Sequence, residues 1–468
     1  MNNDTKRELD EAAIDWAMGE RVGDVVPPSL VTGVRERMAA ASHPADTRSR
    51  ARRFGIAAAV LLGTLVVAAV AWSRTGHREV RYAAVALQDP SRPARVSSRA
   101  LIEALPVGTR YVAGDGLQDE DLPALLRLRD LESLRLSALP PSLPNAHPHQ
   151  SPYRNVSDDG LRMLVGMPKL RSLTLFAQTK LTGRGLEALA HLPALEELTL
   201  YASTAEDEAL TVLSQIPKLK LLHLPSCEGI GKATIERISK IQTLRDLDLS
   251  ECFQLQADWL QQLGQMQNLE RLKLKMDIAV SRGLIGINHA NNRGIIDSTL
   301  AAWTGMKSLR YLDLAGAAIS EVGLRSIRTL GITELDLSHS MILPQAIDKL
   351  PPMLKVLKMR SSLVSYPNLG ERLAKATPNL ATLYLSDCAG INDRILPGLR
   401  KLTGLQALSF AHCTNFTPAA IPELRKFERL IALDVQGWKF LTDEHRVQLR
   451  NMPNLGRLAT DAGLETLR

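Results

Sequence analysis

Four cysteines are the most reactive side chains of this chain, and their spacing indicates what they can do. Cys227 and Cys252 lie 25 residues apart, and so do Cys388 and Cys413. A cysteine can serve as a nucleophile, as a metal ligand or as half of a disulfide. No Cys-x-x-Cys pair occurs, and no histidine recurs at a fixed distance from the cysteines. Zinc sites and catalytic triads therefore lack the spacing that they require.

Other common signatures of catalysis are also missing from the sequence. There is no glycine-rich phosphate loop and no nucleophile elbow. His147, His149 and His289 have the residue type of metal ligands, but they lie in segments that we interpret as solvated loops. We therefore expect a protein that is not an enzyme and has no catalytic residue, cofactor, bound metal or small-molecule substrate.

The elements that position the cysteines belong to an internal repeat of the form L-x-x-L-x-L. Its copies start at Leu131, Leu170, Leu195, Leu219, Leu244, Leu269, Leu309, Ile332, Leu354, Leu380, Leu405, Leu430 and Leu455. Successive starts differ by 22 to 26 residues, except for two intervals of 39 and 40. A unit of this length cannot bury its apolar face alone, so stacked units must share one core. The pattern predicts a leucine-rich-repeat solenoid.

Every repeat has the same predicted internal order. The leucine segment is a strand, a turn with Thr or Ser beside Asp follows, as at Thr442 and Asp443, and a short helix such as that from Gly185 completes the unit. Ser, Thr and Asp accept hydrogen bonds from the free N–H groups of a first helical turn. The expected fold class is α/β, a horseshoe with parallel strands on the concave face and short helices on the convex face. It has about 13–14 repeats over residues 105–468, with a degenerate repeat at 105–130 and a closing helix at 462–468.

The cysteines share one place in the repeat, eight residues after its first leucine, in L-x-x-L-x-L-x-x-C. Together with the Thr-Asp helix starts, this motif resembles the cysteine-containing class of leucine-rich repeats. That class is known from the substrate-binding subunits of F-box ubiquitin ligases and from bacterial proteins. The resemblance covers residues 105–468, although only four units carry the cysteine. It implies that the ninth residue turns inward and helps to satisfy the backbone where the strand ends.

The state of the cysteines follows from strand stacking. Parallel strands ~4.8 Å apart bring Cys227 near Cys252 and Cys388 near Cys413, within the distance that a disulfide tolerates. Side chains in a packed parallel ladder seldom reach the torsion of a disulfide, however, and a free cysteine behaves as a small hydrophobe. We expect reduced, buried thiols, with disulfides as the alternative.

Residues 54–72 differ in kind from the repeats, because they form a run of nineteen residues without a charge. A helix of ~20 apolar residues crosses a bilayer. Arg52 and Arg53 end a basic cluster directly before this run, which favours a cytoplasmic N-terminus and extracytoplasmic repeats. We expect a bacterial-type single-pass protein of the cell membrane, with a small helical segment at 1–53 and a basic linker at 73–104. A cleaved signal peptide or a buried core helix is the alternative.

The concave face is the expected binding surface. Because strand side chains alternate, the third, fifth and seventh residues of each leucine segment point out of it. The candidates for partner contacts are Phe176, Tyr201, His223, Lys273, Tyr311 and Tyr384. Charges alternate in bands, whereas a nucleic-acid reader needs a continuous positive track. We therefore expect a protein or peptide partner and no nucleic acid. The alternative for the charges is that neighbours such as Asp248 and Lys273 only pair across strands.

The two long intervals correspond to insertions near residues 137–155 and 275–296 that leave the same rim. Long loops on a rigid scaffold often carry binding function, although a tolerated surface insertion would look the same. We predict a membrane-anchored, non-catalytic protein that holds its partner on the strands between the insertions. The alternative is a cytosolic adaptor that recruits substrates in the manner of F-box leucine-rich-repeat proteins, although residues 1–50 contain no recognisable F-box pattern.

Overall fold

The computed structural model describes residues 93–138, 156–178, 180–276, 295, 297–317, 319–340, 342–362, 364 and 368–467, all within one compact unit. The expected membrane span at 54–72, the histidines at 147, 149 and 289 and most of both insertions lie outside the described residues. No helix among the residues described is long and apolar enough to cross a membrane.

The described residues form a sheet of 16 strands whose order in space equals their order in sequence. All neighbouring pairs are parallel except the last pair, which is antiparallel. The strands are β1 (Ala94–Val96), β2 (Tyr111–Asp115), β3 (Ser133–Ser137), β4 (Ser172–Phe176), β5 (Glu197–Tyr201), β6 (Leu221–His223), β7 (Asp246–Asp248), β8 (Arg271–Lys273), β9 (Tyr311–Asp313), β10 (Glu334–Asp336), β11 (Val356–Lys358), β12 (Thr382–Tyr384), β13 (Ala407–Ser409), β14 (Ala432–Asp434), β15 (Arg457–Thr460) and β16 (Gly463–Thr466).

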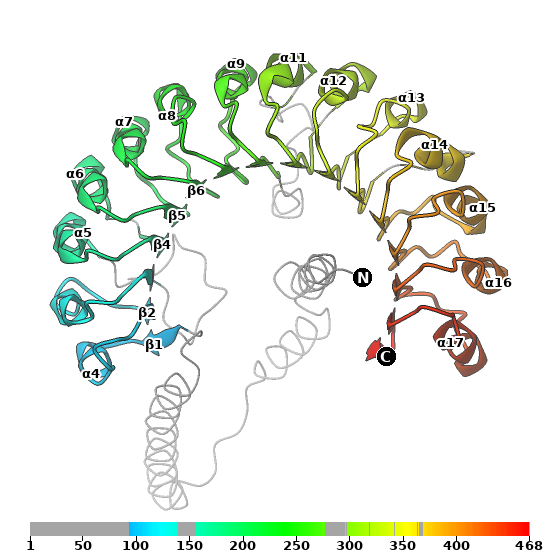
Figure 1. The fold of residues 1–468 in the computed structure, drawn as a ribbon, viewed down its shortest axis with the longest axis horizontal. Coiled ribbons are helices and arrows are strands. Elements are labelled where there is room, and N and C mark those ends of the chain that lie inside the picture. Colours follow the sequence, from blue (N-terminus) through cyan, green and yellow to red (C-terminus); the bar gives the residue numbers. More distant parts are fainter. Residues whose placement is uncertain are drawn as a thin grey trace, which may run out of the picture. The chain divides into compact units, whose positions relative to one another are not determined.

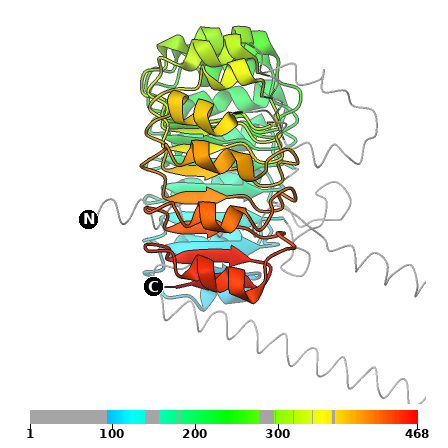
Figure 2. The same ribbon diagram turned by 90° about the vertical axis from the view of Figure 1, so that its right-hand side faces the viewer.

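Short helices connect the strands along the convex side, as Figure 1 shows, and Figure 2 shows the helices of the C-terminal repeats stacked on one another. The α-helices are α4 (Arg99–Glu103), α5 (Asp158–Met163), α6 (Gly183–Ala188), α7 (Asp207–Leu210), α8 (Lys232–Ile238), α9 (Ala257–Gln261), α11 (Asp297–Ala302), α12 (Glu321–Ile327), α13 (Pro344–Ile347), α14 (Leu369–Ala376), α15 (Leu396–Leu399), α16 (Ala420–Leu424) and α17 (Asp443–Arg450). The 3-10 helices are η1 (Leu122–Arg127), η2 (Leu164–Gly166), η3 (Leu189–His191), η4 (Thr211–Gln215), η5 (Gln262–Gln265), η7 (Trp303–Gly305) and η8 (Asp393–Ile395). The predicted leucine-rich-repeat solenoid is confirmed.

The core is one continuous ladder of leucines between the sheet and the helices. Leu247 of β7 pairs in register with Leu222 of β6 and Leu272 of β8, and all three side chains are fully buried. The leucines at the first and sixth positions of the same unit, Leu244 and Leu249, are buried as well. Each leucine is therefore covered by the equivalent residues of both neighbouring repeats, as the alternation of strand side chains predicts.

In ten repeats, the eighth residue turns the chain with a positive φ where the strand ends. This conformation recurs at Ala177, Ala202, Ser226, Glu251, Gly316, His339, Ser361, Asp387, His412 and Gly437. Only two of these ten residues are glycines, although a side chain in the left-handed region is costly. The strain is compensated because the turn directs the ninth residue into the core.

Where the ninth residue is a cysteine, its thiol donates a hydrogen bond to the carbonyl of the preceding repeat's sixth residue. The Sγ atoms of Cys227, Cys252, Cys388 and Cys413 lie 3.1, 3.2, 3.1 and 3.0 Å from the carbonyl oxygens of Leu200, Leu224, Met359 and Leu385. All four cysteines are free and buried, which confirms the predicted thiols. Burial raises the pKa of Cys227 to about 12, so the thiol stays protonated and is a poor nucleophile.

Two predicted ends of the solenoid are corrected by the structure. Residues 94–104, which we expected to be linker, contain β1 and α4, and α4 buries Ile102 in the core. This first unit lacks the L-x-x-L-x-L segment, so it could not be recognised as a repeat from the sequence. Residues 462–468, which we expected to be a helix, contain β16, which pairs antiparallel with β15. Gly463 has a φ of +116° and lets the chain reverse.

Aspartates at or just before helix starts link several repeats to the next one. Asp158, the first residue of α5, accepts a hydrogen bond at 2.8 Å from the backbone N–H of Thr182 and one at 2.5 Å from its hydroxyl. Thr182 in turn caps α6 by accepting a hydrogen bond from Arg184. The same linkage joins Asp119 to Ser157, Asp297 to Ser320 and Asp393 to Thr417. The Ser/Thr-Asp motif is therefore an inter-repeat contact as well as a helix cap.

A glycine makes room for the aspartate in three of these linkages. A β-carbon on Gly185 would lie 2.3 Å from Oδ1 of Asp158, and one on Gly160 or Gly323 would lie 2.3 or 2.5 Å from Oδ1 of Asp119 or Asp297. Gly183, in the same helix as Gly185, has only ordinary contacts, the nearest at 3.4 Å. Neither Gly183 nor Gly185 has a positive φ. The two positions therefore differ in space and not in backbone conformation.

Gly185→Ala should destabilise the domain by about 1–3 kcal/mol, because the new methyl group displaces the Asp158 carboxylate from Thr182. Gly183→Ala is the matched control and should be neutral or stabilising by up to ~1 kcal/mol, since alanine restricts the unfolded chain and favours helix. Urea unfolding followed by circular dichroism measures both. Equal effects of the two substitutions would show that the aspartate linkage contributes nothing.

Candidate partner-binding face

The concave face consists of three rows of side chains that run across the strands, one row each from the third, fifth and seventh residues. The parallel register aligns these residues, so Glu197, Thr199 and Tyr201 of β5 each lie beside the equivalent residue of β4. Side chains from different repeats thus become neighbours at the strand spacing of ~4.8 Å. A partner that binds to this face would therefore contact side chains from several repeats.

Phe176 and Tyr201 form an aromatic stack on this face. Their ring centroids lie 4.5 Å apart at an interplanar angle of 9°, and the Arg135 guanidinium carbon lies 5.8 Å from the centroid of the Phe176 ring. Tyr201 is 36% exposed and Phe176 is half-buried. We call Arg135, Phe176 and Tyr201 the aromatic platform. Its Phe176 pairs with Ser137, the last residue of β3.

The middle of the face holds a chain of polar contacts across three strands, β6, β7 and β8. Nε2 of His223 lies 3.0 Å from Oδ1 of Asp246, and Nε of Arg271 lies 3.3 Å from Oδ2 of Asp246. Burial raises the pKa of Asp246, but the hydrogen bond and charge of His223, with the charges of Lys273 and Arg271, outweigh it and hold this pKa below its usual value. Asp246 is therefore ionised, and its carboxylate oxygens already bind His223 and Arg271.

Tyr311 and Tyr384 were predicted to face solvent, and this prediction is wrong. Tyr311 is 9% exposed, and the guanidinium of Arg271 lies 4.0 Å from its ring centroid. Tyr384 is 7% exposed, with the Arg360 guanidinium carbon 4.9 Å from its ring centroid. Long cationic side chains from adjacent repeats lie over both rings, a contact that strand alternation alone does not reveal.

Charged neighbours pair across strands where their signs are opposite. Nζ of Lys273 lies 3.6 Å from Oδ2 of Asp248, so Lys273 is an ion-pair partner in the described structure. The alternative that adjacent charge bands simply pair is therefore confirmed for these two residues. Among the six candidates from the sequence, Tyr201 keeps the most exposed ring, while His223 and Lys273 take part in polar contacts within the sheet.

Asp313 and Asp336 are like charges directly opposite each other on β9 and β10. Asp313 is 6% exposed, and its carboxylate accepts a hydrogen bond at 3.0 Å from the backbone N–H of Ala315. Burial raises the pKa of Asp313, and the negative charge of Asp336 raises it further, to about 7. Neither carboxylate forms an ion pair within the part of the chain that the structure describes.

The C-terminal part of the face is small and hydroxyl-rich. The hydroxyl of Ser409 donates to Oδ2 of Asp434 at 2.8 Å, and the Ser386 and Ser409 hydroxyl oxygens lie 2.8 Å apart. Burial raises the pKa of Asp434, which is almost inaccessible. These groups satisfy one another, so they offer little to a partner. Across the described ranges, no group of three or more His, Cys, Asp or Glu side chains could hold a metal ion.

Comparison with known proteins gives structural similarity only. No protein-family model matches the chain, and no curated protein matches its sequence. An internalin of Listeria monocytogenes is 18% identical, with 72% of this chain and 92% of that chain covered and a TM-score of 0.42. Rad7, solved in complex with Elc1 in yeast, is 16% identical, with 88% and 98% covered and a TM-score of 0.49. A leucine-rich-repeat protein of Leptospira interrogans is 18% identical, with 80% and 92% covered and a TM-score of 0.44. The leucine-rich-repeat assignment rests on the chain's own register and core.

The raised pKa of Asp313 predicts a pH-dependent stability. The folded protein retains a proton on Asp313 that the unfolded chain has lost above about pH 4, so the free energy of unfolding should fall as pH rises toward 7. Asp313→Asn removes this charge and should stabilise the protein at pH 8, on the order of 1 kcal/mol, with the gain shrinking toward pH 5. Urea unfolding at each pH measures it. Glu444→Gln, at an exposed carboxylate, is the control, and a pH-independent effect of Asp313→Asn would contradict the shift.

Proposed function

We propose that this protein is a non-catalytic binding protein whose concave strands hold a protein or peptide partner, with the aromatic platform as the main contact. The observation that supports this most is the stacked pair Phe176 and Tyr201, because it leaves a rigid ring exposed among side chains that mostly satisfy one another. Exposed aromatic side chains dominate the energetics of many protein interfaces.

The surroundings of the platform support a protein ligand over a nucleic acid. The concave charges near it are of both signs, with Arg135 and Glu197 exposed and His223 bonded to Asp246. Pairs such as Arg171 with Glu196, at 2.9 Å, run along the edge of the same strands. A polynucleotide would meet no continuous positive track here. A peptide with a side chain that stacks on Tyr201 fits this arrangement.

Tyr201→Ala should weaken partner binding by at least about tenfold, the equivalent of ~1.4 kcal/mol, because it removes the exposed half of the stack. The control is Phe253→Ala, which removes another exposed ring, 56% accessible, from the turn after β7. Full-length wild-type and variant chains serve as bait, captured proteins are quantified by mass spectrometry, and the affinity of each reproducible partner is measured. Partners retained equally by both variants, with unchanged circular dichroism, would place the binding site elsewhere.

We also propose that residues 54–72 anchor the protein in the cell membrane, with residues 1–53 in the cytoplasm and the repeats outside it. The support is the sequence itself, nineteen residues without a charge that follow a cluster of arginines. A display of the repeats at a surface would make the concave face accessible to extracytoplasmic partners. The proposed direction of insertion rests on the arginines that directly precede the run.

The full-length chain should remain in the membrane pellet after washing with alkaline carbonate, whereas a variant without residues 54–72 should be released, because the apolar run alone supplies the insertion energy. Protease added outside intact cells should degrade the repeats and leave residues 1–53 protected. Equal release of both proteins would contradict the anchor. Protection of the repeats with an intact anchor would reverse the proposed orientation.

A further inference from the structure

The last repeats contain a concentration of aromatic residues that the concave face does not use. Phe410, Phe416, Phe427 and Phe440 are four of the chain's seven phenylalanines, and Trp438 lies among them. The rings of Phe416 and Trp438 have centroids 4.3 Å apart at 21°, and those of Trp438 and Phe440 are 5.4 Å apart. In a chain with 4% aromatic residues, this cluster is a local departure from the leucine pattern.

The cluster arises where tryptophan replaces cysteine as the ninth residue of a repeat. Trp438 donates its indole N–H at 3.2 Å to the carbonyl of Phe410, the sixth residue of the preceding repeat, as the cysteine thiols do in theirs. Because a cysteine thiol can supply the same hydrogen bond, the carbonyl at this position does not require a side chain as large as tryptophan. Gly437 precedes it with a φ of +77°, which holds the rim turn in its tight form.

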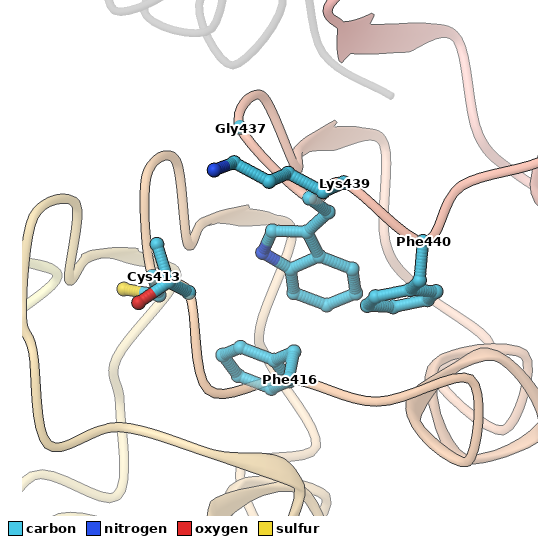
Figure 3. Close-up of a pocket in the computed structure, with 7 residues that line it drawn as sticks. Cys413, Phe416, Gly437, Lys439 and Phe440 are labelled. Atoms are coloured by element: carbon cyan, nitrogen blue, oxygen red, sulfur yellow. The ribbon is translucent and has the colours of Figure 1, made fainter.

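The bulky rings leave a hollow in the rim of about 360 Å³, lined by Thr414, Phe416, Gly437, Trp438, Lys439 and Phe440 together with Cys413 (Figure 3). This volume falls within the range of sites that hold small ligand groups. Phe416 and Trp438 are buried, Phe440 is half-buried, and Thr414 and Lys439 are exposed at the mouth. The hollow thus has an apolar base and a polar entrance.

The entrance carries a free positive charge. Lys439 forms no ion pair with any residue that the structure describes, and in Figure 3 its side chain extends along the upper side of the hollow. The carboxylate of Asp461 accepts a hydrogen bond at 2.6 Å from the Gly437 backbone N–H, whereas Lys439 keeps its charge without a partner among the described residues. An anion beside an inserted ring would complement this arrangement.

We propose that this rim pocket, Thr414 to Phe440, binds an aromatic side chain of a partner peptide that carries carboxylates next to that side chain. The ring packs against Phe440, the half-buried ring of the pocket, and a flanking carboxylate pairs with Lys439. This site lies on the turns at the strand ends, outside the concave rows, and it does not depend on the aromatic platform. The partner class is therefore an acidic, aromatic peptide.

The test uses three capped tripeptides as probes, with the sequences Glu-Phe-Glu, Glu-Ala-Glu and Lys-Phe-Lys, and the purified full-length chain. Saturation-transfer NMR with titration should show saturable binding of Glu-Phe-Glu and at least about threefold weaker binding of each other probe, from loss of the ring or of the charge match. Equal binding of Glu-Phe-Glu and either other probe would overturn the proposal.

Two variants locate the site. Lys439→Glu, at an exposed side chain, should weaken Glu-Phe-Glu at least about threefold and improve Lys-Phe-Lys, while Lys401→Glu, at an exposed lysine of another repeat, should change neither. Thr414→Phe should fill the mouth of the pocket and abolish binding without altering the circular dichroism. Binding that survives Thr414→Phe, or that responds equally to Lys439→Glu and Lys401→Glu, would overturn the assignment. Tyr201→Ala should have no effect, so the outcome is independent of the concave site.

Discussion

The whole domain depends on leucines that only adjacent repeats can bury. Leu247 has no core of its own, because its cover consists of Leu222 and Leu272 from the repeats on either side. Burial of such a side chain stabilises by roughly 1.5–3 kcal/mol, and it requires that the strands keep one register. The linkages at the helix starts and the ninth-residue hydrogen bonds cross the same boundaries between repeats. Cohesion is therefore a property of each interface between neighbours and not of any single repeat.

This fixed register also determines what the concave face can do. It sets unlike charges side by side at Asp248 and Lys273, where they pair, and like charges at Asp313 and Asp336, where burial and repulsion raise the pKa of Asp313. The same spacing brings Phe176 against Tyr201, close to the separation at which aromatic rings stack. A rigid sheet cannot move these groups apart, so the face is preorganised before any partner arrives.

Much of this arrangement could be predicted from sequence, because the leucine period specifies strand order, register and the buried positions. The prediction was wrong where a long side chain from the preceding repeat decides the exposure of a residue, as when Arg271 covers Tyr311. It was also wrong at residues 462–468, since two leucines three apart suit a helix as well as the strand that Gly463 makes possible. The rim pocket depends on how the Trp438 ring packs, and no periodicity indicates that.

The central claim is that stability resides in the interfaces between adjacent repeats. Amide hydrogen exchange of Leu247→Ala, a substitution that should cost about 2–5 kcal/mol, tests it most directly, with the exposed Leu343→Ala as the matched control. We expect faster exchange in β6, β7 and β8 and little change in β2 or β14, while Leu343→Ala leaves protection unchanged. Uniform loss of protection along the whole solenoid, or none around β7, would contradict it.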